Sequence, residues 1–206
     1  MKDKTNQFLL VEGKDDEHVI YALCEKFKVS ETFQVIDSKG IENLFSQIPV
    51  RLKSGINSLG IIIDADSDIK SRYIRLKKIF EPIGFNLPED MPEKGLIISN
   101  QEEIKIGIWI MPNNQISGML EDFISFLVSD DDKLMPVVDE TLNKIENGTL
   151  NKYKQIHKSK ARINTWLAWQ EDPGTPMGLS ITKKYLTTEK ETCIILINWL
   201  NNLFNV

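Results

Sequence analysis

The sequence has few cysteines, no long apolar run and no secretory signal, which excludes several classes of protein. Its 206 residues include only two cysteines, Cys24 and Cys193, which lie far apart in apolar segments. This spacing predicts buried thiols rather than a disulfide framework. The longest apolar run, CIILINWL, is well short of the roughly 18 residues that a membrane-spanning helix needs. The N-terminal residues MKDKTNQ are polar and do not form a secretory signal. We therefore expect a cytoplasmic protein that does not cross a membrane.

Charge of neither sign dominates the composition. The net charge of −5 at pH 7 does not by itself indicate a nucleic-acid-binding protein. Basic residues nevertheless gather in two blocks, which together hold ten of the 25 lysines and arginines. Local positive patches are therefore expected on an acidic protein. The blocks are Lys70, Arg72, Arg75, Lys77 and Lys78, and Lys152, Lys154, Lys158, Lys160 and Arg162.

The first part of the chain alternates between two hydrophobic patterns. Short apolar runs end at Val11, Ile36 and Ile63, and each is followed by apolar residues at helical spacing. The helical patterns cover 15–29, 41–48 and 69–80. This alternation predicts an α/β fold with a mostly parallel sheet that is flanked by helices.

The pattern changes after Pro82. The segments GLIIS and IKIGIWIM predict two more strands, which can pair as a hairpin, and the remainder is mostly helical. We expect a core over residues 1–128 and a helical extension over 129–206 that packs on the core. Trp166 and Trp169 are expected in the hydrophobic core rather than on a base-stacking surface. The expected helices of the later part are 118–128, 131–146, 153–170 and 190–205.

Three aspartates follow the apolar run in SLGIIIDADSD. Residues two apart on a strand face the same way, so Asp64 and Asp66 are expected on one side of the carboxyl end of the strand. Two such carboxylates repel each other unless a cation lies between them, and oxygen ligands favour Mg²⁺, Mn²⁺ or Ca²⁺. Asp68 is either a further ligand or the cap of the next helix. An EF-hand loop is excluded, because Ile69 stands where that loop needs glycine.

Two more acids are predicted at the same edge of the sheet. Glu12 ends the first strand, and Gly13 permits a sharp turn there. Asp16 falls on the apolar face of helix 15–29 and therefore points toward the sheet, close to Glu12. Asp15 and Asp16 can also be explained as caps of the helix N-terminus, an interpretation that we favour for Asp15.

The segments FLLVEGKDDEHVI and LGIIIDADSD resemble the Toprim domain of topoisomerases, bacterial primases, recombination proteins and several nucleases. The resemblance implies a Toprim-like (Rossmann-like) fold in which Glu12, Asp64 and Asp66 hold Mg²⁺ for phosphodiester chemistry. Where many Toprim sequences continue Asp-x-Asp-x-x-Gly, this chain has Ile69, which favours a nuclease over a topoisomerase or primase. The chain is also similar to stand-alone Toprim-like proteins of unassigned function, which share WIMP…LEDF and TWLAWQ.

The most similar branch is that of the overcoming-lysogenization-defect (OLD) nucleases. Asp16 matches an additional acid of that branch, and Leu120-Glu121 matches its downstream Leu-Glu pair. The branch also uses a lysine, for which HKSKARINTWLAWQ offers two candidates. Helical spacing places Lys160 within the apolar stripe of that segment and Lys158 nearly opposite, so Lys160 is preferred. On helix 118–128 the same spacing places Glu121 at the edge of the apolar stripe and points Asp122 away. The sequence lacks the ATPase domain of the larger nucleases, so a separate ATPase subunit is an expected partner.

These observations predict a Mg²⁺- or Mn²⁺-dependent nucleic-acid phosphodiesterase, with DNA favoured over RNA. One or two metal ions would activate water and neutralise the leaving oxygen. Glu12 would act as a ligand or as general acid/base, and Lys160 would stabilise the transition state. The predicted metal ligands are Glu12, Asp16, Asp64, Asp66, Asp68 and Glu121. The predicted nucleic-acid-binding residues are Lys70, Arg72, Arg75, Lys158 and Arg162.

Two alternatives belong to other functional classes. A non-catalytic binding module working with a separate ATPase would keep the acidic cluster for metal or partner recognition, and it would bind metal without cleaving nucleic acid. A small phosphatase with Asp64 as nucleophile is less favoured, because it leaves Glu12 and Asp16 without a role.

Overall fold

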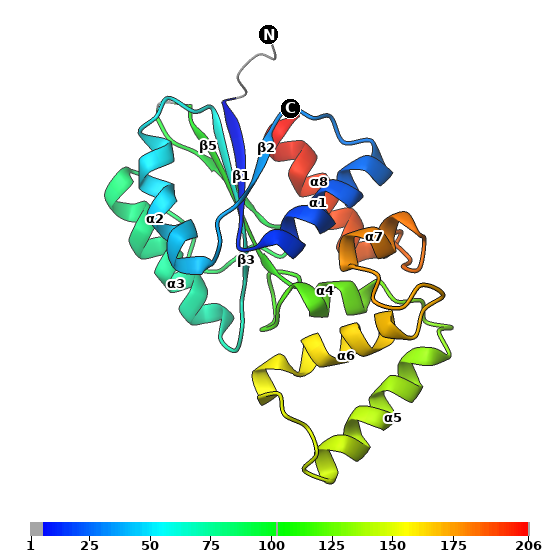
Figure 1. Cartoon of the computed structure of the whole chain (residues 1–206). Coiled ribbons are helices and arrows are strands. Elements are labelled where there is room, and N and C mark those ends of the chain that lie inside the picture. The colour runs from blue at the N-terminus through cyan, green and yellow to red at the C-terminus, as the bar shows by residue number, and fades with distance from the viewer. Residues whose placement is uncertain (1–5, 102, 206) are drawn as a thin grey trace.

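A five-stranded sheet forms the centre of the protein, as the computed structural model shows for residues 6–101 and 103–205 (Figure 1). The strand order is β2-β1-β3-β5-β4, in which β4 alone is antiparallel to its neighbour. This arrangement confirms the predicted α/β class, the mostly parallel sheet and the hairpin. The strands are β1 (Gln7–Val11), β2 (Gln34–Asp37), β3 (Ser58–Asp64), β4 (Leu96–Ser99) and β5 (Lys105–Met111).

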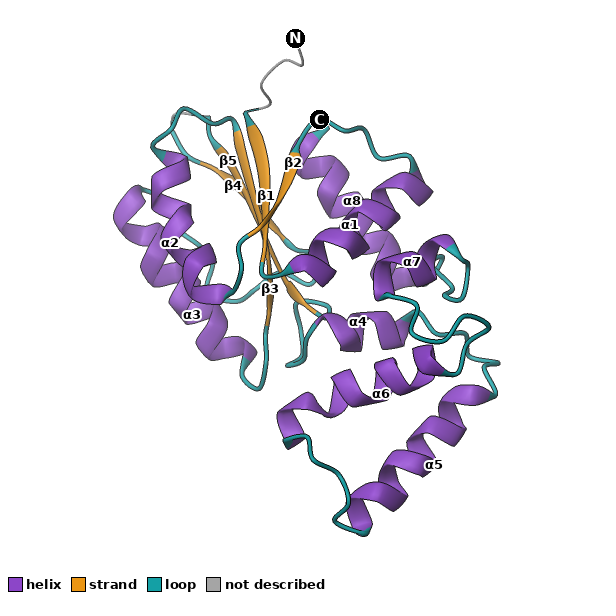
Figure 2. Ribbon diagram, in the orientation of Figure 1, coloured by secondary structure: helices purple, strands orange, loops and turns teal. Residues whose placement is uncertain are grey.

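Helices cover both faces of the sheet (Figure 2). On one face lie α2 (Ile41–Leu52) and α3 (Ile69–Phe80), and on the other lie α1 (Lys14–Phe27), α7 (Met177–Thr182) and α8 (Glu191–Phe204). Each face has its own hydrophobic cluster. The first six residues of β3 are all buried, because helices pack on both sides of this central strand. The apolar run over residues 59–63 matches this double burial.

The middle of the chain forms three helices beyond the carboxyl edge of the sheet. They are α4 (Leu120–Phe126), α5 (Leu134–Asn147) and α6 (Lys158–Ala168), and α6 packs between α4 and α5. Each is shorter than predicted at one or both ends. The six-residue α7 was not predicted, because it is too short to show helical periodicity. Two 3-10 turns, η1 (Glu81–Ile83) and η2 (Gln155–His157), complete the elements.

The C-terminal helix α8 approaches the sheet closely at a pair of glycines. Gly60 of β3 and Gly107 of β5 are register partners. A Cβ on Gly107 would lie 2.5 Å from Leu203 Cδ2, and one on Gly60 would lie 2.9 Å from Phe204 Cζ. The missing side chains therefore let α8 lie against the strands. Helices from beyond residue 128 thus share a hydrophobic core with the first strands, while the domain boundary at residue 128 stays a prediction.

Several smaller predictions concern single side chains. Both cysteines are free thiols, as expected, and Cys193 is buried, but Cys24 is only partly buried, so the predicted burial of both thiols was wrong for Cys24. Trp166 is buried, as predicted, but Trp169 is 43% exposed, so its core assignment was wrong. Trp169 lies at the C-cap, where α6 ends. Within the described residues, no helix is long and apolar enough to cross a membrane.

Candidate metal centre at the carboxyl edge of the sheet

A cleft of about 420 Å³ opens where β1, β2 and β3 end. In open α/β sheets, ligands bind at the carboxyl ends of the strands. Six acids and three lysines from five separate segments of the sequence meet here. The cleft is lined by Glu12, Gly13, Lys14, Asp15, Asp16, Asp37, Lys39, Gly40, Asp64, Leu120, Glu121 and Lys160.

Three of the carboxylates are each oriented by a backbone amide through one oxygen. The Asp64 amide donates to Glu12 Oε1 at 2.8 Å, and the Leu120 amide donates to Asp64 Oδ1 at 2.9 Å. The Gly13 amide donates to Asp16 Oδ2 at 3.1 Å. The helix-capping contact is thus made by Asp16, and the interpretation of Asp15 as the cap was wrong. Gly13, the N-cap residue of α1, brings Asp16 to the third helical position, from which its carboxylate reaches back.

The second carboxylate oxygen of Asp16 gives the strongest local indication that the cleft binds a ligand. Asp16 is 8% exposed, and its Oδ1 atom is buried without a hydrogen-bond partner in the described structure. A buried oxygen of this kind costs free energy unless a partner satisfies it. Because Asp16 lines the cleft, the cleft is where such a partner would sit.

Burial and crowding of like charge raise the pKa values of the cleft acids. Burial, followed by the nearby Asp16 and Glu12 charges, raises the pKa of Asp64 to about 9. Burial and the Glu12 charge raise the pKa of Asp16 to about 7. Burial also raises the pKa of Glu12 and of Glu121. The cluster therefore resists being fully ionised without a cation.

Lys160 forms an ion pair with one of the cleft acids. Among the described residues, no other lysine or arginine pairs with an acid of the cleft lining. The Lys160 Nζ atom lies 3.5 Å from Glu121 Oε1, and the Glu121 side chain is almost completely buried. Burial lowers the pKa of Lys160, but the charges of Glu121 and Asp64 outweigh this effect and raise the pKa overall. Lys158 instead pairs with Glu146 at 2.7 Å, away from the cleft.

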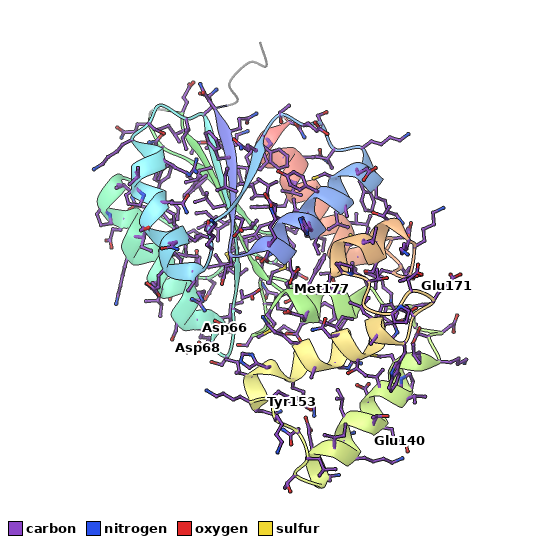
Figure 3. All side chains as sticks on the ribbon, in the orientation of Figure 1. Asp66, Asp68, Glu140, Tyr153, Glu171 and Met177 are labelled. Atoms are coloured by element: carbon purple, nitrogen blue, oxygen red, sulfur yellow. The ribbon has the colours of Figure 1, made fainter. Side chains whose placement is uncertain are left out.

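Asp66 and Asp68 are not among the residues that line the cleft. Figure 3 labels both side chains. β3 ends at Asp64, and Asp66 has a left-handed backbone with φ of 53°, so the strand alternation that we expected no longer applies. The Asp66 carboxylate pairs with Arg72. Asp68 is the N-cap of α3, where its carboxylate accepts from the amide and hydroxyl of Ser71. The expectation that Asp64 and Asp66 share one side was therefore wrong, and the capping alternative for Asp68 is confirmed.

Most of the predicted nucleic-acid-binding cations are engaged in ion pairs. Arg75 pairs with Glu42, Arg162 pairs with Asp139, and Lys158 and Arg72 make the pairs described above. Lys70 is exposed on the first turn of α3. Each paired cation has less charge available for a phosphate than the sequence suggested.

Three residues that matter at the site were not predicted from the sequence. Lys14 and Lys39 line the cleft beside the acids, although they lie outside both basic blocks. Asp122 was expected to point away, yet its carboxylate contacts α6. The Met-Leu-Glu-Asp sequence, with an acid at the third helical position, offered a signal for the capping contact of Asp122, whereas no local pattern indicated the places of Lys14 and Lys39.

The side chains of the cleft are of the kind that binds a divalent cation, but they are not yet close enough together to surround one. The donors are carboxylate oxygens, which suit Mg²⁺ or Mn²⁺. Glu12, Asp16 and Asp64 each keep one oxygen that no backbone amide occupies. Within residues 6–101 and 103–205, however, no three His, Cys, Asp or Glu side chains already surround one point. Side-chain movements would be needed to close a site around an ion.

The fold and the cleft together define a mixed α/β protein with an acidic, lysine-bearing cleft at the carboxyl edge of its sheet. The chain belongs to the family described as "Protein of unknown function (DUF3226)", whose model matches residues 6–205. No curated protein matches the sequence.

One solved structure is similar in fold over nearly the whole chain. It is the C-terminal region of the Xanthomonas campestris pv. campestris OLD protein, with 13% identity and a TM-score of 0.51. The likeness covers 98% of this chain and 97% of that chain. A second structure of the same region has 14% identity and a TM-score of 0.39, with 95% of this chain and 86% of that chain covered. At these identities the comparison establishes the fold alone.

Proposed function

We propose that this chain is a Mg²⁺- or Mn²⁺-dependent phosphodiesterase of the Toprim type that acts on nucleic acid. The observation that carries the proposal is the convergence of Glu12, Asp16, Asp64 and Glu121 with Lys160 in one cleft. The fold shared with the C-terminal region of an OLD protein is consistent with a nuclease-related module. The Toprim resemblance of the Glu12 and Asp64 segments points to the same chemistry.

The position of each side chain in the cleft suggests its role in the reaction. Asp64 and Asp16 would hold the ion, and Glu12 would either join them or act as general acid/base on the attacking water. Glu121 would contribute from the opposite wall. A bound divalent cation supplies charge stabilisation and a more acidic water at such a site. Lys160, held beside Glu121, would stabilise negative charge on the phosphate.

The flanking cations would bind the phosphate backbone on either side of the cleft. Lys39 and Lys14 lie at the end of β2 and the start of α1, whereas Lys160 enters from α6. Contacts with phosphates carry no sequence information, so binding would depend strongly on salt and little on base sequence.

The test is cleavage of single- and double-stranded DNA and RNA with Mg²⁺ or Mn²⁺. Wild type is compared with Asp64→Asn and with Asp131→Asn, which alters an exposed aspartate outside the cleft. Metal-dependent cleavage that Asp64→Asn abolishes and Asp131→Asn retains is the expected result. Metal binding without cleavage by wild type would favour the non-catalytic binding module. Cleavage that survives in Asp64→Asn would overturn the proposal.

A further inference from the structure

Three consecutive residues in the first turn of α4 contact the end of β3, Lys160 of α6 and Ser159 of α6. The Leu120 amide holds Asp64, and Glu121 meets Lys160. Asp122 forms the third connection. Its Oδ2 atom accepts from the Met119 amide at 2.9 Å, and its Oδ1 atom accepts from the Ser159 hydroxyl at 2.6 Å.

Ser159 immediately precedes Lys160 in the first turn of α6. A hydrogen bond to Ser159 therefore fixes the end of α6 from which Lys160 extends. Lys160 is long, flexible and 48% exposed, so its own packing does little to restrict it. Its position beside Glu121 depends on where the first turn of α6 is held.

Asp122 and Asp16 occupy equivalent places in their helices but use their oxygens differently. Both accept from the backbone amide three residues earlier. The second oxygen of Asp16 is left without a partner in the cleft, while that of Asp122 is taken by Ser159. The close approach is built into the backbone, because Gly118 has φ of 148° and a Cβ there would lie 2.8 Å from Asp122 Oδ2. Both oxygens of Asp122 are thus engaged in hydrogen bonds, one of which joins α4 to α6, and Asp122 is not among the residues that line the cleft.

We propose that Asp122 is a positioning residue, whose carboxylate joins α4 to α6 and thereby holds Lys160 against Glu121 at the cleft. The consequence for cleavage rests on the proposed function, but the contact itself does not. A second ion pair, Arg162 with Asp139 of α5, holds α6 from its other side. Asp139→Asn is therefore a matched control, since it removes one carboxylate that bonds to α6 without touching the cleft.

The first experiment needs no enzymatic activity. A double-mutant cycle of Glu121→Gln and Lys160→Met, followed by urea unfolding in metal-free buffer, measures the coupling between these side chains. We expect this coupling in wild type and in an Asp139→Asn background, and its loss in an Asp122→Asn background. Equal coupling in all three backgrounds would overturn the proposal.

The second experiment measures single-turnover cleavage with Mn²⁺. Asp122→Asn and Ser159→Ala should each slow cleavage by about 10- to 100-fold, because small misplacements of a catalytic group have effects of this size. Ser159→Ala leaves the Met119 contact of Asp122 in place, and Ser159→Thr should restore the rate. In a Lys160→Met background, Asp122→Asn should add little further loss.

Either of two results would reduce Asp122 to a purely structural role. One is an equal loss of rate in Asp139→Asn, and the other is a full additional loss in the Lys160→Met background. If wild type does not cleave any nucleic acid, the proposed function fails by itself. The coupling between Glu121 and Lys160 then decides the role of Asp122 alone.

Discussion

Glu12 and Asp64 stand at the ends of paired parallel strands, joined by the hydrogen bond from the Asp64 amide to Glu12 Oε1 at 2.8 Å. The bond places two acidic side chains close together at a partly buried edge. Such an arrangement opposes folding when both groups are ionised and no cation is present. The same free-energy cost makes the cleft receptive to a cation, so stability and ligand binding are opposed at Asp64.

Replacing Asp64 by Asn should stabilise the metal-free protein and abolish metal binding. The pKa of Asp64 is raised from 3.8 to about 9, so the folded state holds a proton that the unfolded state has lost between these values. The contribution of Asp64 to stability is therefore greatest below pH 3.8 and is lost as the pH rises toward 9. Asn avoids this loss and can still accept from the Leu120 amide.

We expect Asp64→Asn to raise the free energy of unfolding by about 1 kcal/mol at pH 8 and by less at pH 5. Urea denaturation with EDTA measures the change. Asp131→Asn, at an exposed position, should leave stability nearly unchanged. A destabilised Asp64→Asn protein at both pH values would contradict the account of crowded acids.

Metal binding should release protons and should strengthen as the pH rises. The pKa of Asp64, about 9, means that this group holds a proton from pH 6 to 8, and the pKa of Asp16, about 7, means that Asp16 loses its proton within the same range. A cation must displace these protons, so its affinity should rise by up to about tenfold for each pH unit and proton. Calorimetry with Mn²⁺ in buffers of different ionisation enthalpy counts the protons. Affinity that is independent of pH, with no proton release, would be incompatible with this arrangement.

The sequence predicted the sheet and part of the site because both follow from local patterns. Glu12 and Asp64 each end an apolar run, and strand ends are easily located by such runs. Asp66 was placed wrongly, because nothing local shows that β3 stops two residues earlier. The partner of Asp122 was beyond local reasoning, since Ser159 is 37 positions away in the sequence.

The two basic blocks show that the sequence alone also does not reveal which cations are free to bind phosphate. A run of lysines and arginines predicts a positive patch only if no acid from elsewhere in the chain meets it. Arg75 and Glu42 are 33 positions apart, yet they pair across neighbouring helices. Lys39, an isolated lysine in a turn, reaches the cleft because β2 ends beside β1. Tertiary packing, rather than sequence clustering, decides which cations face the cleft.

Gly107→Ala should destabilise the protein by forcing α8 away from the sheet. The new Cβ would lie 2.5 Å from Leu203 Cδ2 and 2.9 Å from Trp199 Cζ2, and crowding of this kind costs about 1–3 kcal/mol. Thermal and urea unfolding measure the loss. The double variant Gly107→Ala/Leu203→Ala should lose less unfolding free energy than the sum of the losses in the two single variants. Strict additivity would show that α8 does not press on β5 at this point.

Arg72→Gln should strengthen the binding of Mn²⁺. Arg72 pairs with Asp66, and its charge also lowers the pKa of Glu12, although burial raises that pKa overall. Removing the guanidinium would remove a positive charge that repels the metal ion, and it would leave the negative charge of Asp66, which also acts on Glu12, without its partner. We expect a gain in affinity of about three- to tenfold, on the order of 1 kcal/mol.

Arg75→Gln is the matched control for Arg72→Gln. It lies on the same helix, carries the same charge and pairs with Glu42 outside the cleft lining. Its affinity for Mn²⁺, measured by calorimetry, should equal that of wild type. Unchanged or weaker binding by Arg72→Gln would show that Asp66 and Arg72 act independently of the metal site.

Lys39→Gln should weaken nucleic-acid binding more than Arg162→Gln does. Lys39 lines the cleft and takes part in no ion pair within the described residues, whereas Arg162 is neutralised by Asp139 at 2.6 Å. A phosphate would therefore gain a full unpaired charge from Lys39 but must compete with a carboxylate for Arg162. Fluorescence anisotropy with a labelled DNA strand, repeated over a range of salt concentrations, measures both variants. Lys39→Gln should reduce the slope of log affinity against log salt by about one, as expected when one phosphate contact is lost. A larger loss for Arg162→Gln would place the nucleic acid along α6 instead of across the cleft.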